Sequence, residues 1–254
     1  MTRILLSGCM GKMGQTTARV AGNSPEFVIS AGYDLVPAAQ AQTYPVFNSI
    51  KLCPPDCDVI IDFSSPQNLT AILEYALEHK LPLVLATTGL TEDQQKQLAD
   101  ASGQIAVFQS ANMSLGANLL MTLAQTAAQA LETGYDIEIV EKHHNQKVDA
   151  PSGTALSVAQ AINSALSAQR DYRFERQSRR EKRPADEIGI HAIRGGTIVG
   201  DHTVIFAGLD EVIEITHKAA SRDIFAAGAL RAASFIVRQN PGLYNFQSLI
   251  GHTS

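Results

Sequence analysis

The sequence is poor in the features that mark secreted and membrane proteins. Its three cysteines, Cys9, Cys53 and Cys57, are an odd number with no repeated pair, so we expect no disulfide framework. No stretch approaches the ~20 consecutive apolar residues that a membrane-spanning helix needs. The apolar run after Arg3 covers only residues 4–6, which is too short for a secretory signal. We therefore expect a cytoplasmic protein with no membrane partner.

An excess of charge of one sign is also missing. The formal net charge is -5, with 18% charged and 45% hydrophobic residues, an ordinary balance for a globular protein. Residues 170–183 are locally basic, with seven Lys or Arg against three acidic residues. A basic strip can mark a nucleic-acid site, but this one has only two aromatic residues and no recognisable nucleic-acid-binding motif. We interpret it as a solvated edge or a subunit contact, and expect no nucleic-acid partner.

The pair Cys53 and Cys57 suggests a metal site, with Pro54, Pro55 and Asp56 between the two thiols. A structural zinc site needs four ligands, and no second cysteine pair or suitably spaced histidine follows to complete the set. We therefore expect a loop stiffened by proline and no metal.

The first part of the chain alternates short apolar runs with amphipathic stretches, a pattern typical of parallel strands joined by crossover helices. Strands are predicted at residues 4–7, 27–33, 59–63, 83–86 and 105–109. Helices are predicted at 11–21, 66–78 and 92–101, the last with Thr91 as its N-cap. The fold class that follows is an N-terminal Rossmann-type doubly wound parallel sheet.

The pattern changes after residue 112. It predicts a long helix over 114–131, a strand over 135–141, a helix from about Pro151 to 166, and strands at 188–193, 198–206 and 212–218. Turn residues at 195–196 and 208–210 suggest hairpins, so the second domain is expected to be α+β with a mixed, mostly antiparallel sheet. A last helix over 224–238 is expected to return to the first domain. We thus predict a dinucleotide-binding domain at 1–112 plus about 222–254, and a substrate-binding and oligomerisation domain at 113–221.

A glycine-rich turn follows the first strand. Gly8, Cys9, Met10, Gly11, Lys12, Met13 and Gly14 lie between that strand and a helical pattern. Glycines allow a sharp turn, and the free amides at a helix start attract a pyrophosphate. The spacing is G-x-x-G-x-x-G, with Met10 where the second glycine of the usual fingerprint stands.

The second predicted strand ends at Asp34, about twenty residues after the last glycine, where a ribose-binding acid is expected. The residues alone leave open a glycine-rich turn with a surface carboxylate. Later strand ends carry small polar groups that could line a nicotinamide or could serve only as turn chemistry. The stretches that carry these groups are Ala86, Thr87 and Thr88 after one strand, and Ser110, Ala111, Asn112 and Met113 after another.

Residues 141–155 gather two histidines, two lysines and two acids between a strand and a helix. Ser152 is a plausible N-cap for the helix, whose exposed amides would bind a carboxylate. His143, His144 and Lys147 would add proton-donating or positive groups beside that anion site. Polar residues before a helix are also common in ordinary loops, so the cluster is a candidate site until its geometry is known.

The spacing H-x-x-x-K-x-D-x-P-S-G-T-A, which runs from His143 to Ala155, resembles the hallmark of the dihydrodipicolinate reductase family, also called 4-hydroxy-tetrahydrodipicolinate reductases, of bacterial lysine and diaminopimelate biosynthesis. Further matches cover most of the chain: the glycine turn, residues 62–64, 86–89, 110–112, 194–196 and 215–219. Two positions depart from the family pattern, Met10 in the glycine turn and Ala86 where some relatives carry glycine.

The resemblance implies an NAD(P)H-dependent oxidoreductase that converts 4-hydroxy-tetrahydrodipicolinate to tetrahydrodipicolinate. Water is lost from the hydroxylated ring, a hydride from nicotinamide reaches ring C4, and the resulting enamine is protonated at the neighbouring carbon. His143 would donate or accept a proton and Lys147 would donate one. His144, Gly153 and Thr154 would bind the cyclic dicarboxylate substrate.

By the same resemblance, the cofactor would contact residues 8–13, Asp34, residues 86–88 and residues 110–113, and the protein would be a homotetramer. NADH is expected to be preferred over NADPH, because Asp34 repels a 2′-phosphate and residues 35–37 supply no compensating cation. Two other classes remain open: another two-domain NAD(P)-dependent amino-acid or semialdehyde dehydrogenase, and a dinucleotide sensor without turnover.

Overall fold

The structure is a computed structural model that describes residues 1–36 and 42–251. It divides into two compact units, one made of Met1–Leu115 with Arg222–Ser254 and the other of Gly116–Ser221. The sequence predicted the second domain at residues 113–221. Pro37, which belongs to the segment considered for cofactor choice, lies outside the described residues.

Unit 1 contains, in its described residues, a seven-stranded sheet in the order β12-β6-β5-β4-β1-β2-β3. Every neighbouring pair in this sheet is parallel, which confirms the predicted doubly wound sheet. The strands are β1 (Thr2–Ser7), β2 (Phe27–Tyr33), β3 (Val46–Phe47), β4 (Val59–Asp62), β5 (Leu83–Leu85), β6 (Ala106–Gln109) and β12 (Gly242–Tyr244).

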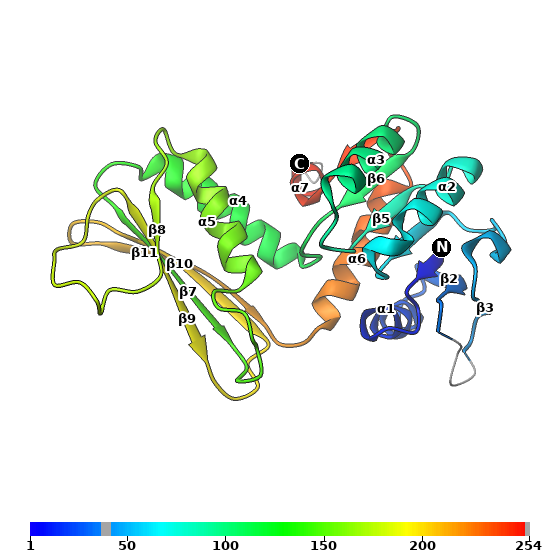
Figure 1. Cartoon of the computed structure of the whole chain (residues 1–254), viewed down its shortest axis with the longest axis horizontal. Coiled ribbons are helices and arrows are strands. Elements are labelled where there is room, and N and C mark those ends of the chain that lie inside the picture. Colours follow the sequence, from blue (N-terminus) through cyan, green and yellow to red (C-terminus); the bar gives the residue numbers. More distant parts are fainter. Residues whose placement is uncertain (37–41, 252–254) are drawn as a thin grey trace. The chain divides into compact units, whose positions relative to one another are not determined.

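Successive side chains of a strand point to opposite faces of the sheet. Because the strands of unit 1 are apolar on both faces, helices cover both of them. In β1, Leu5 belongs to a buried cluster with α2 (Leu69–His79) and α3 (Glu92–Ser102). Ile4 and Leu6 belong to a second cluster with α6 (Asp223–Ile236) and α7 (Phe246–Gly251), and α6 also packs against α1 (Lys12–Gly22) (Figure 1). The last long helix therefore returns to the first unit, as predicted. Thr91 caps α3 in a reciprocal capping box with Gln94.

Unit 2 is built on a second sheet in the order β11-β10-β7-β9-β8. α4 (Leu115–Ala130) and α5 (Gly153–Ala165) cover the same face of this sheet (Figure 1), where their alanines and larger aliphatic side chains pack on alternate residues of three strands. The strands are β7 (Asp136–His143), β8 (Asp171–Arg173), β9 (Glu187–Arg194), β10 (Gly200–Ala207) and β11 (Val212–Ala219).

The sheet of unit 2 is mixed and mostly antiparallel, as predicted. The antiparallel ladders of β10 with β11 and β7 contain eight and seven residue pairs, and the parallel ladders of β9 with β7 and β8 contain seven and three. The hairpin predicted at residues 208–210 is present. The one suggested at residues 195–196 is wrong, because β7 lies between β9 and β10 and the connection passes over the end of β7. Gly195 donates its amide hydrogen to the carbonyl of His143 there, at 2.9 Å.

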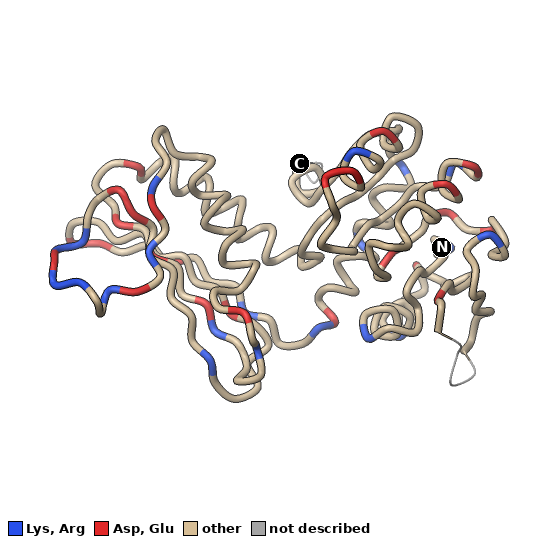
Figure 2. The backbone as a smooth tube through the Cα atoms, viewed as in Figure 1, with Lys and Arg blue, Asp and Glu red and all other residues tan. Residues whose placement is uncertain are grey.

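The basic segment at residues 170–183 is less solvated than its composition suggested. It contains β8 and the loop that follows, which is rich in Lys and Arg (Figure 2). Arg173, Arg176 and Arg183 turn back onto the sheet and form ion pairs with Glu138 and Glu187. Much of this positive charge is therefore balanced within the unit.

Candidate active site

The turn after β1 requires glycine at two positions. Gly8 has a φ of 72°, and a Cβ there would lie 2.7 Å from the backbone carbon of Phe63. A Cβ at Gly14 would lie 2.2 Å from the carbonyl oxygen of Gly8, so this glycine lets α1 pack directly on the turn. Gly11 is the N-cap of α1, whose first amides have no acceptor within the helix. The turn thus presents a helix N-terminus with little bulk around it.

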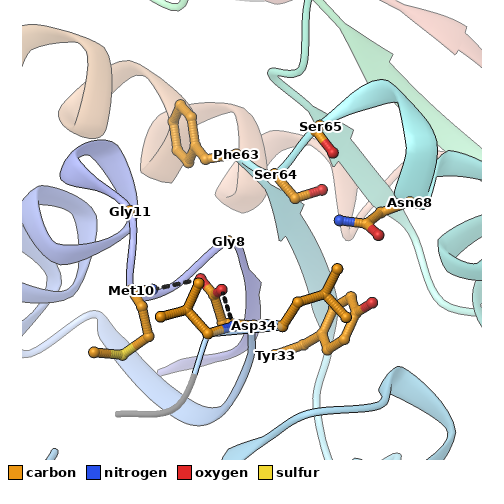
Figure 3. Close-up of a pocket in the computed structure, with 11 residues that line it drawn as sticks. Gly8, Met10, Gly11, Tyr33, Asp34, Phe63, Ser64, Ser65 and Asn68 are labelled. Carbon is orange, nitrogen blue, oxygen red and sulfur yellow. Dashed lines mark hydrogen bonds between the residues drawn. The ribbon is translucent and has the colours of Figure 1, made fainter. Parts of the chain in front are cut away.

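Asp34 follows β2 beside this turn. One carboxylate oxygen accepts a hydrogen bond from the Met10 amide at 2.8 Å, and the other accepts one from the Val36 amide at 2.9 Å (Figure 3). The Met10 side chain, which stands at the second glycine position of the usual fingerprint, points away from this carboxylate (Figure 3). The carboxylate is therefore fixed in place before any ligand arrives.

A cavity of about 350 Å³ opens between the ends of β1, β2 and β4. Its walls include Met10, Asp34, Leu35 and Asn68, together with the Ser64–Ser65 turn (Figure 3). The glycine turn, the fixed carboxylate and the apolar walls match what the phosphate, ribose and base of a nucleotide require. These residues fit the adenosine half of a nicotinamide dinucleotide.

Several side chains proposed to contact the cofactor are used inside the fold instead. The Cys9 thiol is buried against Gly32, so Cys9 could reach a ligand only through its backbone. The Thr87 hydroxyl donates to buried Asp62 at 2.6 Å, which ties the end of β5 to the end of β4. Met113 is buried in the core. The remaining expected contacts, Lys12, Met13, Ala86, Thr88, Ser110, Ala111 and Asn112, are exposed or partly exposed at the turn or at strand ends.

In unit 2, β7 carries Glu141 and His143 on the sheet face that α5 covers. Glu141 is 0% exposed, and its carboxylate lies 2.6 Å from Nδ1 of His143. It also accepts the Ser152 amide at 2.9 Å and both terminal nitrogens of Arg194 at 2.7 and 2.8 Å. Burial by itself would raise the pKa of Glu141, but the hydrogen bonds from Arg194, His143 and Ser152 hold it below its usual value.

α5 begins immediately beyond this carboxylate. The Ser152 hydroxyl accepts the Ala155 amide at 3.2 Å, which confirms Ser152 as the N-cap. Gly153 and Thr154 form the first turn of the helix, where the amides and the helix dipole favour an anion. The sequence-predicted carboxylate site therefore lies at a capped helix N-terminus in the structure.

Lys147 and His144 lie in the loop between β7 and α5. The Lys147 ammonium forms a 2.8 Å ion pair with Asp149, and this lysine lowers the pKa of the exposed Asp149 carboxyl. His144 is partly exposed at the end of β7. His143, Lys147, Gly153 and Thr154 thus belong to one strand, loop and helix start, as their closeness in the sequence predicted.

His202 lies on β10, within the strand predicted at residues 198–206. It is buried on β10 directly opposite Glu141, and its Nε2 lies 3.0 Å from the Ser152 hydroxyl. Its ring meets that of His143 edge-on, with 5.3 Å between centroids. Burial first, and then the neighbouring His143, lowers the pKa of His202 to about 4, so the ring stays neutral near pH 7.

The comparisons with known proteins follow the same two units. A family model described as the N-terminus of dihydrodipicolinate reductase matches residues 2–113, and one described as its C-terminus matches residues 116–250. The chain belongs to the dihydrodipicolinate reductase family.

Members of this family resemble the chain over its whole length. The 4-hydroxy-tetrahydrodipicolinate reductase of Caldanaerobacter subterraneus subsp. tengcongensis is 50% identical over 250 residues, which cover 98% of each chain. That of Clostridium tetani is 45% identical over 98% of this chain and 97% of its own. A solved structure described as dipicolinate-bound dihydrodipicolinate reductase from Paenisporosarcina sp. TG-14 has a TM-score of 0.84 and 25% identity, and the match covers 98% of this chain and 99% of that one.

Glu141 and Arg194 lie in the cluster around His143, although no role was assigned to them from the sequence. Glu141 belongs to residues 141–155 and Arg194 to a stretch that carries the resemblance, but the two pair across neighbouring strands. One feature of the sequence could have indicated this pair. Glu141 alternates with the apolar residues Ile137 and Ile139 in its strand, so it is expected to be buried, and a buried carboxylate requires a cation from elsewhere in the chain.

Three further findings concern the thiols, possible metal ligands and the length of the helices. Burial raises the pKa of Cys9 and Cys57 to about 11 and that of Cys53 to about 12. Among residues 1–36 and 42–251, no three potential ligands are grouped to hold a metal ion. In the same described part of the chain, every helix is too short or too polar to cross a bilayer.

Proposed function

We propose that this chain reduces 4-hydroxy-tetrahydrodipicolinate to tetrahydrodipicolinate with a nicotinamide cofactor, in lysine and diaminopimelate biosynthesis. The observation that carries the proposal is the match of the two family models to the two halves of the chain, with a nucleotide-binding turn in one unit and the His143 to Thr154 cluster in the other. Other two-domain dehydrogenases share the first unit but do not need this cluster.

The substrate-binding residues are Gly153, Thr154 and His144. A substrate carboxylate fits the first turn of α5, where it accepts hydrogen bonds from backbone amides and from the Thr154 hydroxyl. The relative from Paenisporosarcina was solved with dipicolinate bound, a planar dicarboxylate of the size of this substrate. His144, partly exposed at the end of β7, adds a hydrogen-bond donor on the same loop.

His143 and Lys147 are the acid–base residues. When bound, the nicotinamide supplies the hydride that reaches the substrate ring. Lys147 carries an ammonium proton that can pass to the resulting enamine carbon, and its partner Asp149 holds it in the loop until substrate binds. His143, supported by Glu141, donates or accepts a proton beside it. Loss of the ring hydroxyl as water needs such a donor.

The cofactor-binding residues are the glycine turn from Gly8 to Met13, Asp34, residues 86–88 and residues 110–113; Cys9, Thr87 and Met113 take part through their backbone, because their side chains are used inside the fold. NADH is preferred over NADPH, because the fixed Asp34 carboxylate can accept hydrogen bonds from ribose hydroxyls and repels a 2′-phosphate. Leu35 and Val36, which line the same cavity, supply no positive charge.

The protein is a cytoplasmic homotetramer that pairs through the sheets of its second units. Two observations support this: both helices of unit 2 cover one face of its sheet, and all three cysteines are free and buried. Light scattering coupled to size exclusion gives the mass directly, and a monomer at micromolar concentration would contradict the assembly.

The test of the function is reduction of freshly prepared 4-hydroxy-tetrahydrodipicolinate, followed by loss of the reduced-nicotinamide absorbance. Lys147→Ala is expected to lower kcat by ~10²-fold or more, typical of a lost general acid. Lys142→Ala, next to the motif in the sequence, is the matched control. A wild-type protein that acts only on open-chain substrates would support the rival dehydrogenase: it would reduce the oxidised cofactor with an amino acid, or oxidise the reduced cofactor with a semialdehyde. Binding without turnover would support a sensor.

A further inference from the structure

A single buried ion pair connects all the groups proposed for chemistry in unit 2. Glu141 is fully buried, and each of its carboxylate oxygens accepts two hydrogen bonds. One oxygen takes the Ser152 amide and an Arg194 nitrogen, and the other takes the second Arg194 nitrogen and Nδ1 of His143. The carboxylate thus joins β7, the end of β9 and the start of α5.

Arg194 extends the same connection to the loop that carries Lys147. Besides its two bonds to Glu141, it donates to the backbone carbonyl of Asp149 at 2.7 Å and to that of Ile193 at 2.8 Å. Arg194 lies opposite His143 in the strand register, so its side chain reaches Glu141 across one strand spacing. The loop is therefore held at Asp149, two residues after Lys147.

The contact with Glu141 also decides which nitrogen of His143 carries a proton. The low pKa of Glu141 leaves its carboxylate ionised, and an ionised carboxylate only accepts hydrogen bonds. Nδ1 of His143 must therefore be the N–H donor, and Nε2 is the nitrogen available for proton transfer. Nε2 lies against Gly200, where a Cβ would come within 3.0 Å. Glycine at 200 keeps a side chain away from this edge of the ring.

We propose that Glu141 and Arg194 are positioning residues for the reductase reaction: their buried pair fixes the Nδ1–H tautomer of His143 and holds the carboxylate-binding helix start and the Lys147 loop in register with it. When His143 becomes doubly protonated, Glu141 balances the new charge, and when Nε2 gives up its proton, Nδ1 keeps its own. This inference rests on the acid–base role proposed for His143.

Three measurements separate this role from a merely structural ion pair. The first is the tautomer of His143 in the wild-type protein, read from two-bond ¹⁵N–¹H correlations of the imidazole and assigned by the signal lost in His143→Asn. We expect a protonated Nδ1 and an unprotonated Nε2 in the neutral ring. A neutral ring protonated at Nε2 overturns the proposal, and this result does not depend on activity or on any variant of Glu141.

The second measurement is the kinetics of Glu141→Gln, whose amide can donate or accept and so no longer selects a tautomer. We expect kcat to fall at least about tenfold, with a smaller change in the inhibition constant of pyridine-2,6-dicarboxylate. The matched control is Glu187→Gln, which removes another buried carboxylate, 2% exposed and paired with Arg173 and Arg176 in the same sheet. A wild-type kcat in a folded Glu141→Gln protein, or equal losses in both variants, overturns the proposal.

The third measurement uses Gly200→Ala, which serves if Glu141→Gln does not fold. This change leaves Glu141 and Arg194 in place and puts a methyl group against Nε2 of His143. We expect a lower kcat with the Nδ1–H tautomer retained, and an unchanged kcat overturns the role assigned to Nε2. An active His143→Asn protein would instead remove the acid–base assignment itself, and a wild type without reductase activity would remove the proposed function while leaving the tautomer result standing.

Discussion

Cofactor choice can be tested at Leu35, which lines the nucleotide cavity next to Asp34. Leu35 is 63% exposed, so an arginine there adds a cation beside the expected 2′-phosphate with little effect on packing. Asp34 is a poorer target, because its carboxylate also holds the amides of Met10 and Val36. Leu35→Arg therefore changes the charge of the site and leaves the glycine turn as it is.

The size of the effect follows from the exposure of the new pair. An exposed ion pair contributes about 0.2–1 kcal/mol, and a well-formed hydrogen bond to a charged group contributes about 1.5–3 kcal/mol. We expect a wild-type preference for NADH of roughly tenfold in kcat/KM, which corresponds to about 1.4 kcal/mol. Leu35→Arg should gain a similar factor for NADPH and bring the two cofactors close to parity.

The assay is kcat/KM for each cofactor at fixed substrate, at low and at high ionic strength. Leu35→Gln, of similar length without charge, is the control. The preference should shrink as salt increases, because exposed charges are screened beyond about 10 Å at 0.1 M. A wild type with equal or better use of NADPH, or an arginine variant indistinguishable from the glutamine variant, would refute the reasoning.

Three further results are expected. Gly14→Ala should weaken dinucleotide binding in a titration and lower the melting temperature, because its Cβ would lie 2.2 Å from the Gly8 carbonyl oxygen; unchanged binding would show that the turn can shift. Thr154→Val should raise KM more than it lowers kcat, because it removes a hydrogen bond to a substrate carboxylate that contributes up to roughly 1.5–3 kcal/mol to binding. Normal inhibition by pyridine-2,6-dicarboxylate would contradict this. The pKa of His202 falls from 6.5 to about 4 on folding, so the unfolded chain binds the proton first and stability should drop as the pH falls through this window, by up to about 3 kcal/mol. Chemical denaturation of wild type and His202→Asn between pH 4 and 7 checks it, because the variant should lose less.

Most of the architecture could be predicted because it depends on local pattern. Strands β1, β2, β4, β5 and β6 of unit 1 are apolar runs bounded by turn residues, and the helices of this unit carry an apolar stripe and recognisable caps such as Thr91. Strands β3, β8 and β12 were missed, since their two or three residues form no apolar run of strand length and pair only because a neighbour presents an open edge. The prediction of a hairpin at residues 195–196 was wrong for a related reason. Turn residues do not reveal whether the strands before and after them are neighbours, and here β7 lies between the two.

The sequence by itself determined which groups of the proposed site lie together, because His143, Lys147, Gly153 and Thr154 fall within one strand end, one loop and one helix start. Their order along the chain is enough to bring them close. Only the tertiary structure decided what holds them there. Arg194 and His202 are more than fifty residues from Glu141, and strand register places them beside it. A buried carboxylate needs a cation or hydrogen-bond donors nearby. The pairing of β7 with β9 and β10 decides which residues fill that role for Glu141.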